Sequence, residues 1–352
     1  MDFRPFFSPE TRFWRSSNFV LESGEQLEEV EVAYRTWGNF DGDNAVLVCH
    51  ALTGSADADT WWAPLLGSER SLDPARNFII CSNILASCYG TTGPASLNPR
   101  TGRLWGADFP SITIRDMVRL QALLLNSLGI QRLKLVLGGS LGGMQALEWA
   151  LLYPERVEAM AAIACSGRHS AWCIGLSEAQ RQTIFADPLW QQGHYDPDQP
   201  PAAGLAAARM VAMCTYRSQT SFEARFGRER NSQHRFAIAE YLRYQGTRLV
   251  QHFDANAYVA LTYAMDAHDV GENRGSYETA LASILIPTLI VAIDSDVLYP
   301  PEEQQELARF IPDARFAWLH SDHGHDAFLI EMDALDEIML NFRANLGKDA
   351  DE

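Results

Sequence analysis

Positive charge is scarce in this chain of 352 residues, which has 28 Lys and Arg against 45 Asp and Glu and a formal net charge of -17. A negative excess of this size repels phosphate backbones and anionic lipid headgroups. We therefore expect neither a nucleic acid nor a membrane surface as a partner. Any anionic ligand requires a local cluster of basic side chains.

Long apolar runs are missing as well. Spanning a bilayer takes roughly 18 or more consecutive apolar residues, whereas even the stretch at 120–128 is interrupted by Gln121, Asn126 and Ser127. Residues 1–17 mix charged side chains among aromatic ones and lack the apolar core of a signal peptide. These patterns predict a soluble, cytoplasmic protein.

Cysteine is rare: six are present, and no two of them form a CxxC pair. Several lie inside apolar runs, as Cys49 and Cys81 do, which is typical of small buried residues in a reducing compartment. Cys88 and Cys165 remain candidates for a reactive thiol, because a neighbouring base or a helix N-terminus activates cysteine.

Short β-branched runs alternate with amphipathic stretches along the chain, and 47% hydrophobic residues supply enough material for a large core. Strand patterns occur at 29–36, 45–49, 77–82, 133–137, 159–164, 287–293 and 315–319. Helix patterns at 114–128 and 144–153 lie between some of them. The alternation predicts an α/β fold, with a mostly parallel central sheet and helices on both faces.

One connection is much longer than a normal crossover, namely that between the strand patterns at 159–164 and 287–293. The intervening residues 166–283 are rich in helix formers and lack strong strand patterns. We therefore predict a helical cap at 166–283. It is inserted into an α/β core made of residues 1–165 and 284–352.

A G-x-S-x-G motif stands at residues 138–142, between a strand pattern and a helix pattern. This context is that of a nucleophile elbow, a strained turn that exposes its serine. Gly138 and Gly142 leave out side chains that would collide with neighbouring backbone, and the following helix N-terminus favours an oxyanion. Ser140 is the predicted nucleophile, and a glycine-rich turn needed only for packing is the alternative.

A serine hydroxyl becomes a good nucleophile only when a histidine, held by a carboxylate, takes its proton. In proteins with this elbow, the acid and then the histidine follow the serine along the chain. The candidates are Asp294 and Asp296 after the strand pattern at 287–293, and His320, His323 and His325 after that at 315–319. The clustered histidines also suit zinc, but no distant ligand pattern accompanies them, and we expect no metal.

The second oxyanion donor normally comes from the loop after an early strand. Here the pattern at 45–49 runs into residues 50–54, so the backbone amide of Leu52 is the candidate. Its partner is the amide of Leu141, which follows the nucleophile. We expect His50 to support this loop rather than to catalyse.

Taken together, these motifs resemble the homoserine O-acetyltransferase family of methionine biosynthesis, a branch of the α/β-hydrolase superfamily. The resemblance covers most of the chain, through residues 21–24, 32–38, 50–56, 89–94, 108–117, 138–149, 296–301 and 324–329. It implies an acyltransferase that passes the acetyl group of acetyl-CoA to the hydroxyl of L-homoserine through an acyl-Ser140 intermediate.

Site residues follow from the same resemblance. The family patterns D-x-L-Y-P and G-H-D-A-F-L select Asp296 and His325 as the partners of Ser140. They also imply that Arg209 binds the carboxylate of homoserine and Asp326 its ammonium group, a pairing of charges that the chemistry favours. Arg217 is the rival for the arginine. Residues 84–88 depart from the family pattern, which has more glycine there.

Several alternatives stay open within this reading. Members of the family use acetyl-CoA or succinyl-CoA, and some relatives acylate serine, so a homoserine O-succinyltransferase or a serine acyltransferase fits the same motifs. A serine esterase would use the same triad. The acyl-CoA is a substrate, so no cofactor is expected, and the resemblance implies a homodimer.

Overall fold

The computed structural model describes residues 7–346, with one eight-stranded sheet at its centre in the order β1-β2-β4-β3-β5-β6-β7-β8. The six strands from β4 to β8 in this order pair in parallel, whereas β2 is antiparallel to β4 and β1 is antiparallel to β2. The strands are β1 (Arg12–Val20), β2 (Gln26–Trp37), β3 (Ala45–Cys49), β4 (Phe78–Ser82), β5 (Leu135–Gly139), β6 (Met160–Ile163), β7 (Thr288–Ile293) and β8 (Ala314–Leu319).

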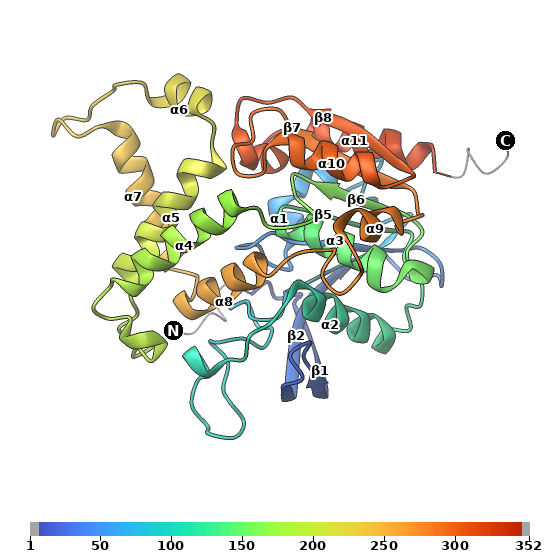
Figure 1. Ribbon diagram of the computed structural model, residues 1–352, viewed down its shortest axis with the longest axis horizontal. Helices are drawn as coiled ribbons and strands as arrows, with labels where there is room; N and C mark the ends of the chain where they lie inside the picture. Colours follow the sequence, from blue (N-terminus) through green and yellow to red (C-terminus); the bar gives the residue numbers. More distant parts are fainter. Residues whose placement is uncertain (1–6, 347–352) are drawn as a thin grey trace.

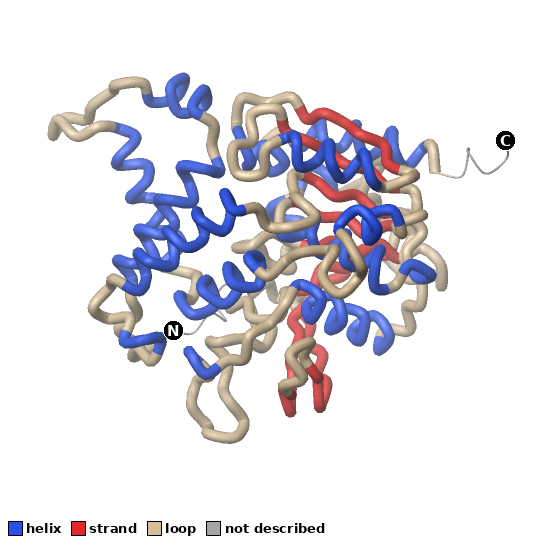
Figure 2. Tube along the Cα trace, in the orientation of Figure 1, coloured by secondary structure: helices blue, strands red, loops and turns tan. Residues whose placement is uncertain are grey.

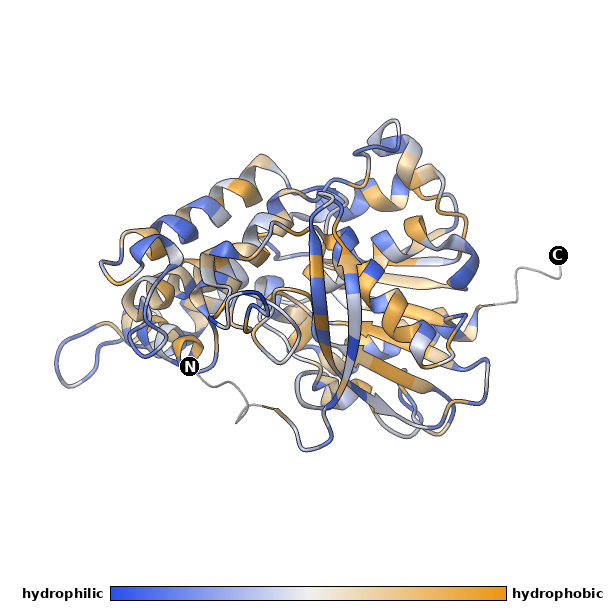
Figure 3. Cartoon of the chain, turned by 90° about the horizontal axis from the view of Figure 1, so that it is seen from below, coloured by the Kyte–Doolittle hydropathy of each residue, from blue (hydrophilic) through white to orange (hydrophobic). Residues whose placement is uncertain are grey.

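The central strands are buried because their sequences are continuous apolar runs. Every residue of β3, β5, β6 and β7 is buried, which is the pattern of parallel strands covered on both faces. Figure 3 shows the strands of the sheet interior largely in the colours of hydrophobic residues. Strand β1 at the edge is mostly exposed and mixes charged and polar residues with aromatic ones, so sequence patterning misses it.

Helices cover both faces of the sheet, which confirms the predicted α/β class. On one face, side chains of α2 (Ile114–Ser127), α3 (Leu141–Leu152), α9 (Tyr277–Ala282) and α10 (Pro301–Phe310) share one apolar cluster with the strands. On the other face, α1 (Ala58–Trp61) and α11 (Met332–Ala344) share another. The short 3-10 helices are η2 (Ala63–Leu65), η3 (Gly106–Asp108), η4 (Pro154–Arg156), η5 (Gln191–Gly193) and η6 (Gly324–Leu329).

Five further helices lie between β6 and β7 in the chain and stand as a group beside the sheet (Figures 1 and 2). They are α4 (Ala171–Phe185), α5 (Ala202–Tyr216), α6 (Gln219–Phe226), α7 (Ala237–Val250) and α8 (Ala255–Asp266). We call this group the cap helices. The division into a core of residues 1–165 and 284–352 and a cap of residues 166–283 stays a prediction. Residues 1–6 and 347–352 of the predicted core lie outside the described residues.

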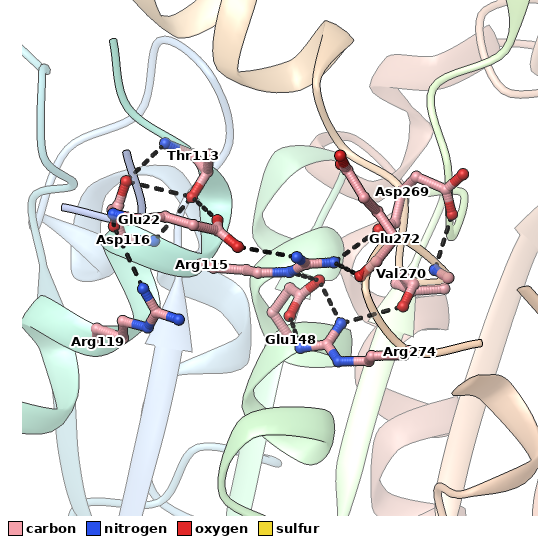
Figure 4. Close-up of polar contacts among 11 residues, drawn as sticks. Glu22, Thr113, Arg115, Asp116, Arg119, Glu148, Asp269, Val270, Glu272 and Arg274 are labelled. Carbon is pink, nitrogen blue, oxygen red and sulfur yellow. Dashed lines mark hydrogen bonds and ion pairs between the residues drawn. The ribbon is translucent and has the colours of Figure 1, made fainter. Parts of the chain in front are cut away.

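A buried charge network ties α3 to its surroundings (Figure 4). Glu148 on α3, with a side chain 1% exposed, accepts hydrogen bonds from Arg274 at 2.7 and 3.0 Å and from Arg115 at 3.3 Å. Arg115 on α2 also donates to Glu22 and to the backbone carbonyls of Asp269 and Glu272. The helix that begins next to Ser140 is thereby joined to the segment that returns from the cap helices to α9.

No helix within residues 7–346 combines the length and the apolar character needed to cross a membrane.

Candidate active site

Ser140 occupies the turn between β5 and α3 in a strained conformation, with φ 57° and ψ -124°. A positive φ is uncommon outside glycine and marks stored backbone strain, which tends to occur at functional sites. The two flanking glycines are required here. A Cβ on Gly142 would overlap the carbonyl oxygen of Cys49, and one on Gly138 would overlap the backbone of Gly142. The turn therefore has the geometry of a nucleophile elbow.

Asp296 and His325 follow β7 and β8, whose carboxyl ends lie at the same edge of the sheet as that of β5. His325 Nδ1 lies 2.6 Å from Asp296 Oδ2, and both residues are buried, 3% and 4% exposed. The other oxygen, Oδ1, accepts the backbone N–H groups of Leu298 and Tyr299 at 2.8 and 3.0 Å. Asp296 is thus fixed as an acceptor on both oxygens.

The pKa of His325 is raised by its pairing with Asp296. Burial by itself lowers the pKa of a histidine, but the charge and the hydrogen bond of Asp296 outweigh burial here, and the charge of Asp326 adds to them. A histidine with a raised pKa is a stronger base. The pair is therefore suited to accept the proton of a serine hydroxyl.

The competing residues are engaged elsewhere. Asp294 lies 2.8 Å from the exposed ring of His320, and His323 lies 3.1 Å from the hydroxyl of Ser221. The geometry thus separates Asp296 and His325 from their rivals, as the family patterns do. Within residues 7–346, no three His, Cys, Asp or Glu side chains are grouped as a metal ion would need.

Packing places the end of β5 against η6, the short helix that contains His325. A Cβ added to Gly139 would lie 2.6 Å from the ring of Phe328, and this ring is centred 5.5 Å from that of His325. The residue before Ser140 is therefore in contact with a side chain that packs on His325. Serine, histidine and aspartate converge on one region of the molecule.

The two candidate oxyanion amides lie on adjacent segments. Leu141 is the first residue of α3, where backbone N–H groups have no partner inside the helix. Gly142 is in close contact with Cys49, the residue at which the loop containing Leu52 begins. In addition, Gln145 Nε2 on α3 donates to the carbonyl of His50 at 3.2 Å. The loop and the helix N-terminus are thus held side by side.

Both ring nitrogens of His50 contact the backbone. Its Nδ1 lies 2.8 Å from the carbonyl of Ala51, and its Nε2 lies 3.2 Å from the backbone N–H of Ile84. Burial lowers the pKa of His50 to about 4. The neutral ring therefore donates from Nδ1 and accepts at Nε2, which links two backbone segments.

Charged side chains from the cap helices approach His325. Arg217, next after α5, has its Nε 3.2 Å from Asp326 Oδ2, as an ion pair without hydrogen-bond alignment. Arg209 on α5 lies over the ring of Tyr216, 5.1 Å from its centroid, and that ring is centred 5.8 Å from His325. Both arginines and Asp326 therefore lie in the same region of the structure. The sequence analysis had treated Arg209 and Arg217 as alternatives for one role, that of binding the carboxylate.

Arg209 has unused bonding capacity and, unlike Arg217, forms no ion pair with Asp326 in the structure. The buried Nη1 of Arg209 has no hydrogen-bond partner, and a buried unsatisfied cation is costly unless a ligand pairs with it. Burial raises the pKa of Asp326, although Arg209, Arg217 and His325 each act to lower it. The cluster offers one cationic and one anionic contact beside the catalytic histidine.

A cavity of about 290 Å³ reaches Gly139, the residue before Ser140, and sequence reasoning missed several of its residues. It is lined by Ala51, Thr53, Gly54, Ser55, Trp61, Tyr89, Gly139, His252, Phe328 and Leu329. These residues come from six separate segments, so no local pattern could have grouped them. A larger cavity of about 580 Å³ lies between residues 94–108 and 193–200 and includes no member of the triad.

The two cysteines considered as reactive thiols are both buried. Burial raises the pKa of each thiol, Cys88 and Cys165, and this keeps the sulfur protonated. The unusual segment at 84–88 contains Ala86, whose φ of 68° lies in the left-handed region. That conformation explains why glycine is the expected residue there.

Comparisons with known proteins identify the family of the chain. The family described as alpha/beta hydrolase fold matches residues 44–331. The chain is 60% identical to "Homoserine O-acetyltransferase" of Chloroherpeton thalassium, over 98% of this chain and 92% of that one. It is 62% identical to the protein of the same name from Nostoc punctiforme, over 96% and 98%.

Solved structures resemble the chain along almost its full length. Esterase E22 has a TM-score of 0.88 at 29% identity, covering 95% of this chain and 99% of that one. The homoserine O-acetyltransferase from Bacillus anthracis also has a TM-score of 0.88, at 25% identity, covering 95% and 97%. With these relatives and this elbow, the chain belongs to the homoserine O-acetyltransferase family of the α/β hydrolases.

Proposed function

We propose that this protein transfers the acetyl group of acetyl-CoA to the hydroxyl of L-homoserine in two steps. In the first step, Ser140 Oγ attacks the thioester carbonyl while His325 accepts the serine proton. The amides of Leu52 and Leu141 stabilise the oxyanion. The carbon–sulfur bond then breaks, His325 returns its proton to the departing thiolate, and an acetyl ester remains on Ser140.

The second step reverses these roles. The hydroxyl of homoserine gives its proton to His325 and attacks the acetyl ester, the ester bond to Ser140 breaks, and His325 returns the proton to Ser140 Oγ. No cofactor takes part, because acetyl-CoA is consumed as a substrate. The observation that carries the proposal is the buried pair of His325 and Asp296 at 2.6 Å beside a strained serine.

The charged cluster supports an amino acid as the acceptor. The unpaired Nη1 of Arg209 suits a carboxylate, and Asp326 suits an ammonium group. Since Arg217 already forms an ion pair with Asp326, we assign the carboxylate to Arg209 and give Arg217 the role of holding Asp326 in place. These assignments go beyond the fold and are proposals.

The cavity next to Gly139 supports acetyl-CoA over succinyl-CoA as the donor. Its lining residues carry no acidic or basic side chain apart from His252, and burial lowers the pKa of that histidine. The pantetheine arm and an acetyl group are uncharged, whereas a succinyl group would bring a carboxylate that needs a partner. The uncharged lining is the ground on which we propose acetyl-CoA as the donor.

Thiol release distinguishes these substrates. The purified protein is given acetyl-CoA or succinyl-CoA, each with homoserine or with serine, and free thiol is followed with a chromogenic disulfide. We expect rapid release only with acetyl-CoA and homoserine together. Equal or faster release with succinyl-CoA or with serine would assign a different donor or acceptor to the same site.

A serine esterase is the second candidate, since esterase E22 has nearly the same fold. An esterase hydrolyses p-nitrophenyl acetate in the absence of CoA, and its turnover is independent of any amino acid. We expect homoserine to accelerate release of p-nitrophenol in this protein, because it relieves a slow hydrolysis of the acetyl-Ser140 ester. A rate that homoserine leaves unchanged would favour the esterase.

Two further proposals concern the setting of the enzyme. We propose a homodimer, on the basis of the family resemblance, and light scattering after size exclusion tests it. We also propose a cytoplasmic location. All six cysteines are free thiols, as is usual in a reducing compartment, and activity without oxidant in cell extract would agree with this location.

A further inference from the structure

Residues 296–299 form the loop that carries the catalytic acid, and we call them the acid loop. Side chains that take no direct part in the proposed reaction hold this loop in place. Two contacts come from the first turn of α4. Trp172 Nε1 donates to the carbonyl of Val297 at 2.8 Å, and Cys173 Sγ donates to the carbonyl of Leu298 at 3.1 Å. The acid loop is thus attached to the first of the cap helices.

A buried chain of side chains makes a third attachment. The hydroxyl of Tyr299, a residue 0% exposed, lies 3.1 Å from His169 Nε2. His169 Nδ1 lies 3.0 Å from Asp266 Oδ1, and Asp266 Oδ2 lies 2.6 Å from Arg181 Nη2. Asp266 is the last residue of α8 and Arg181 belongs to α4. The chain therefore runs from two cap helices to the acid loop.

The direction of each hydrogen bond follows from the groups involved. A carboxylate paired with arginine is an acceptor, so His169 donates from Nδ1 to Asp266, and the neutral ring then has its acceptor at Nε2. Burial raises the pKa of Tyr299 well above its usual range, so its hydroxyl keeps its proton and donates to His169. One tautomer of His169 satisfies both contacts.

The chain ends on the catalytic pair itself. The backbone N–H of Tyr299 donates to Asp296 Oδ1 at 3.0 Å, and the ring of Tyr299 is centred 5.3 Å from that of His325. A shift of Tyr299 would therefore disturb both the acid and the base. Contacts of this kind hold reacting groups in their productive geometry.

We propose that His169 is a positioning residue for the catalytic triad, acting through the hydroxyl of Tyr299 to keep Asp296 and His325 aligned. This inference rests on the proposed function for the identity of the triad. The side chain of residue 169 must then place a hydrogen-bond acceptor at the position of Nε2. The triad by itself has no such requirement.

Two amide substitutions at residue 169 test this requirement. In His169→Gln, the side-chain amide reaches the position of Nε2 and can present its oxygen to Tyr299. In His169→Asn, the shorter amide reaches only the position of Nδ1. We expect formation of acetyl-Ser140, measured as the burst of CoA, to slow by roughly tenfold to hundredfold in His169→Asn and in Tyr299→Phe. His169→Gln should retain most of the wild-type rate.

The pH dependence of the burst rate distinguishes a loss of positioning from a loss of stability. A loss of stability by itself does not shift the pH profile. His325 faces Asp296, Asp326, Tyr216 and Tyr299, and Asp296 is the main group that raises its pKa. Loosening that contact lowers the pKa of His325, so the acid limb of the profile should move to lower pH in Tyr299→Phe. On the other side of His169, burial lowers the pKa of His268 to about 3, so His268 stays neutral throughout.

Tyr195→Phe is the matched control, because it removes a hydrogen-bonded hydroxyl that contacts Asp254 and the backbone of Asn256, away from both His169 and the acid loop. It should keep the wild-type burst rate and acid limb even if its Tm falls as far as that of Tyr299→Phe. Equal burst rates in His169→Gln and His169→Asn, or a slow Tyr299→Phe with an unmoved acid limb, would overturn the proposal. Absence of any burst in the wild type would instead overturn the proposed function.

Discussion

At the scale of single residues, the site combines a strained serine with a buried base and acid. Ser140 is held at a positive φ by its place between β5 and α3, and the two oxygens of Asp296 are both engaged. The positive φ of Ser140 costs stability, which is common at functional sites, whereas the hydrogen bonds of Asp296 fix its orientation. Their consequences are testable one residue at a time.

Ser140→Ala should abolish acyl transfer and leave the fold intact, because it removes the nucleophile and only one hydroxyl. Incubation with acetyl-CoA alone followed by intact-protein mass spectrometry should show an acetyl adduct on the wild type and none on the variant. An adduct that persists on the variant would mean that another residue is the nucleophile.

Asp296→Asn should lower turnover by about four orders of magnitude, since an amide neither orients His325 correctly nor stabilises its charged form. Asp294→Asn is the control, because Asp294 pairs with the exposed His320. Steady-state thiol release measures both variants, and similar losses in the two would contradict the assignment of the acid.

Arg209→Ala and Asp326→Ala should impair the second half-reaction much more than the first. Each removes a charge-assisted contact to the acceptor, worth roughly 1.5 to 3 kcal/mol, or about a tenfold to hundredfold loss in kcat/KM for homoserine. Stopped-flow measurement of the CoA burst, followed by titration with homoserine, separates the two steps.

Exposed residues of the same charge serve as controls for this pair. Arg228→Ala and Asp322→Ala remove surface charges on the cap and near the histidine and should leave both steps unchanged. Loss of the burst in a folded Arg209→Ala protein would show that Arg209 serves the donor, and Arg217 would then be the better candidate for the acceptor carboxylate.

At the scale of elements, α3 is the part of the fold on which the site depends most. It begins beside Ser140, and Glu148 joins it to α2 and to the segment that returns from the cap helices (Figure 4). Glu148 and Arg115 are buried and Arg274 is partly exposed, and together they fix the nucleophile helix against α2 and against the segment at 269–274.

Glu148→Ala should lower the free energy of unfolding by about 3 kcal/mol, because it leaves the buried Arg115 without its carboxylate and also removes the partner of the partly exposed Arg274. Chemical denaturation measures the change. Glu155→Ala, which removes an exposed carboxylate from the 3-10 helix just after α3, should change stability by less than about 0.5 kcal/mol. A small effect of Glu148→Ala would mean that water or other carbonyls replace the lost partner.

At the scale of the whole molecule, the net charge of -17 opposes the approach of a polyanionic acyl-CoA. Salt screens this repulsion, with a Debye length of about 8 Å at physiological ionic strength. We expect kcat/KM for acetyl-CoA to rise as salt increases toward that value, and kcat/KM for zwitterionic homoserine to stay nearly constant. A fall for acetyl-CoA would reveal a local basic docking site that outweighs the net charge.

The sequence by itself determined the features that depend on local pattern. The apolar runs that became β3, β5 and β7 indicated a parallel sheet because such strands are buried on both faces. The G-x-S-x-G motif located the elbow because its glycines avoid a collision within the turn itself, as the close approach of Gly138 and Gly142 shows. Topology alone left two acids and three histidines open, and the family patterns chose between them.

Only the tertiary structure decided what depends on distant segments meeting. It placed Arg209 and Arg217 together beside Asp326, and it assembled the cavity whose wall includes Tyr89 and His252. It also joined His169 to Tyr299 across more than a hundred residues of chain. Such contacts leave no trace in local periodicity, because periodicity records which face of an element is buried and not which side chain it will meet there.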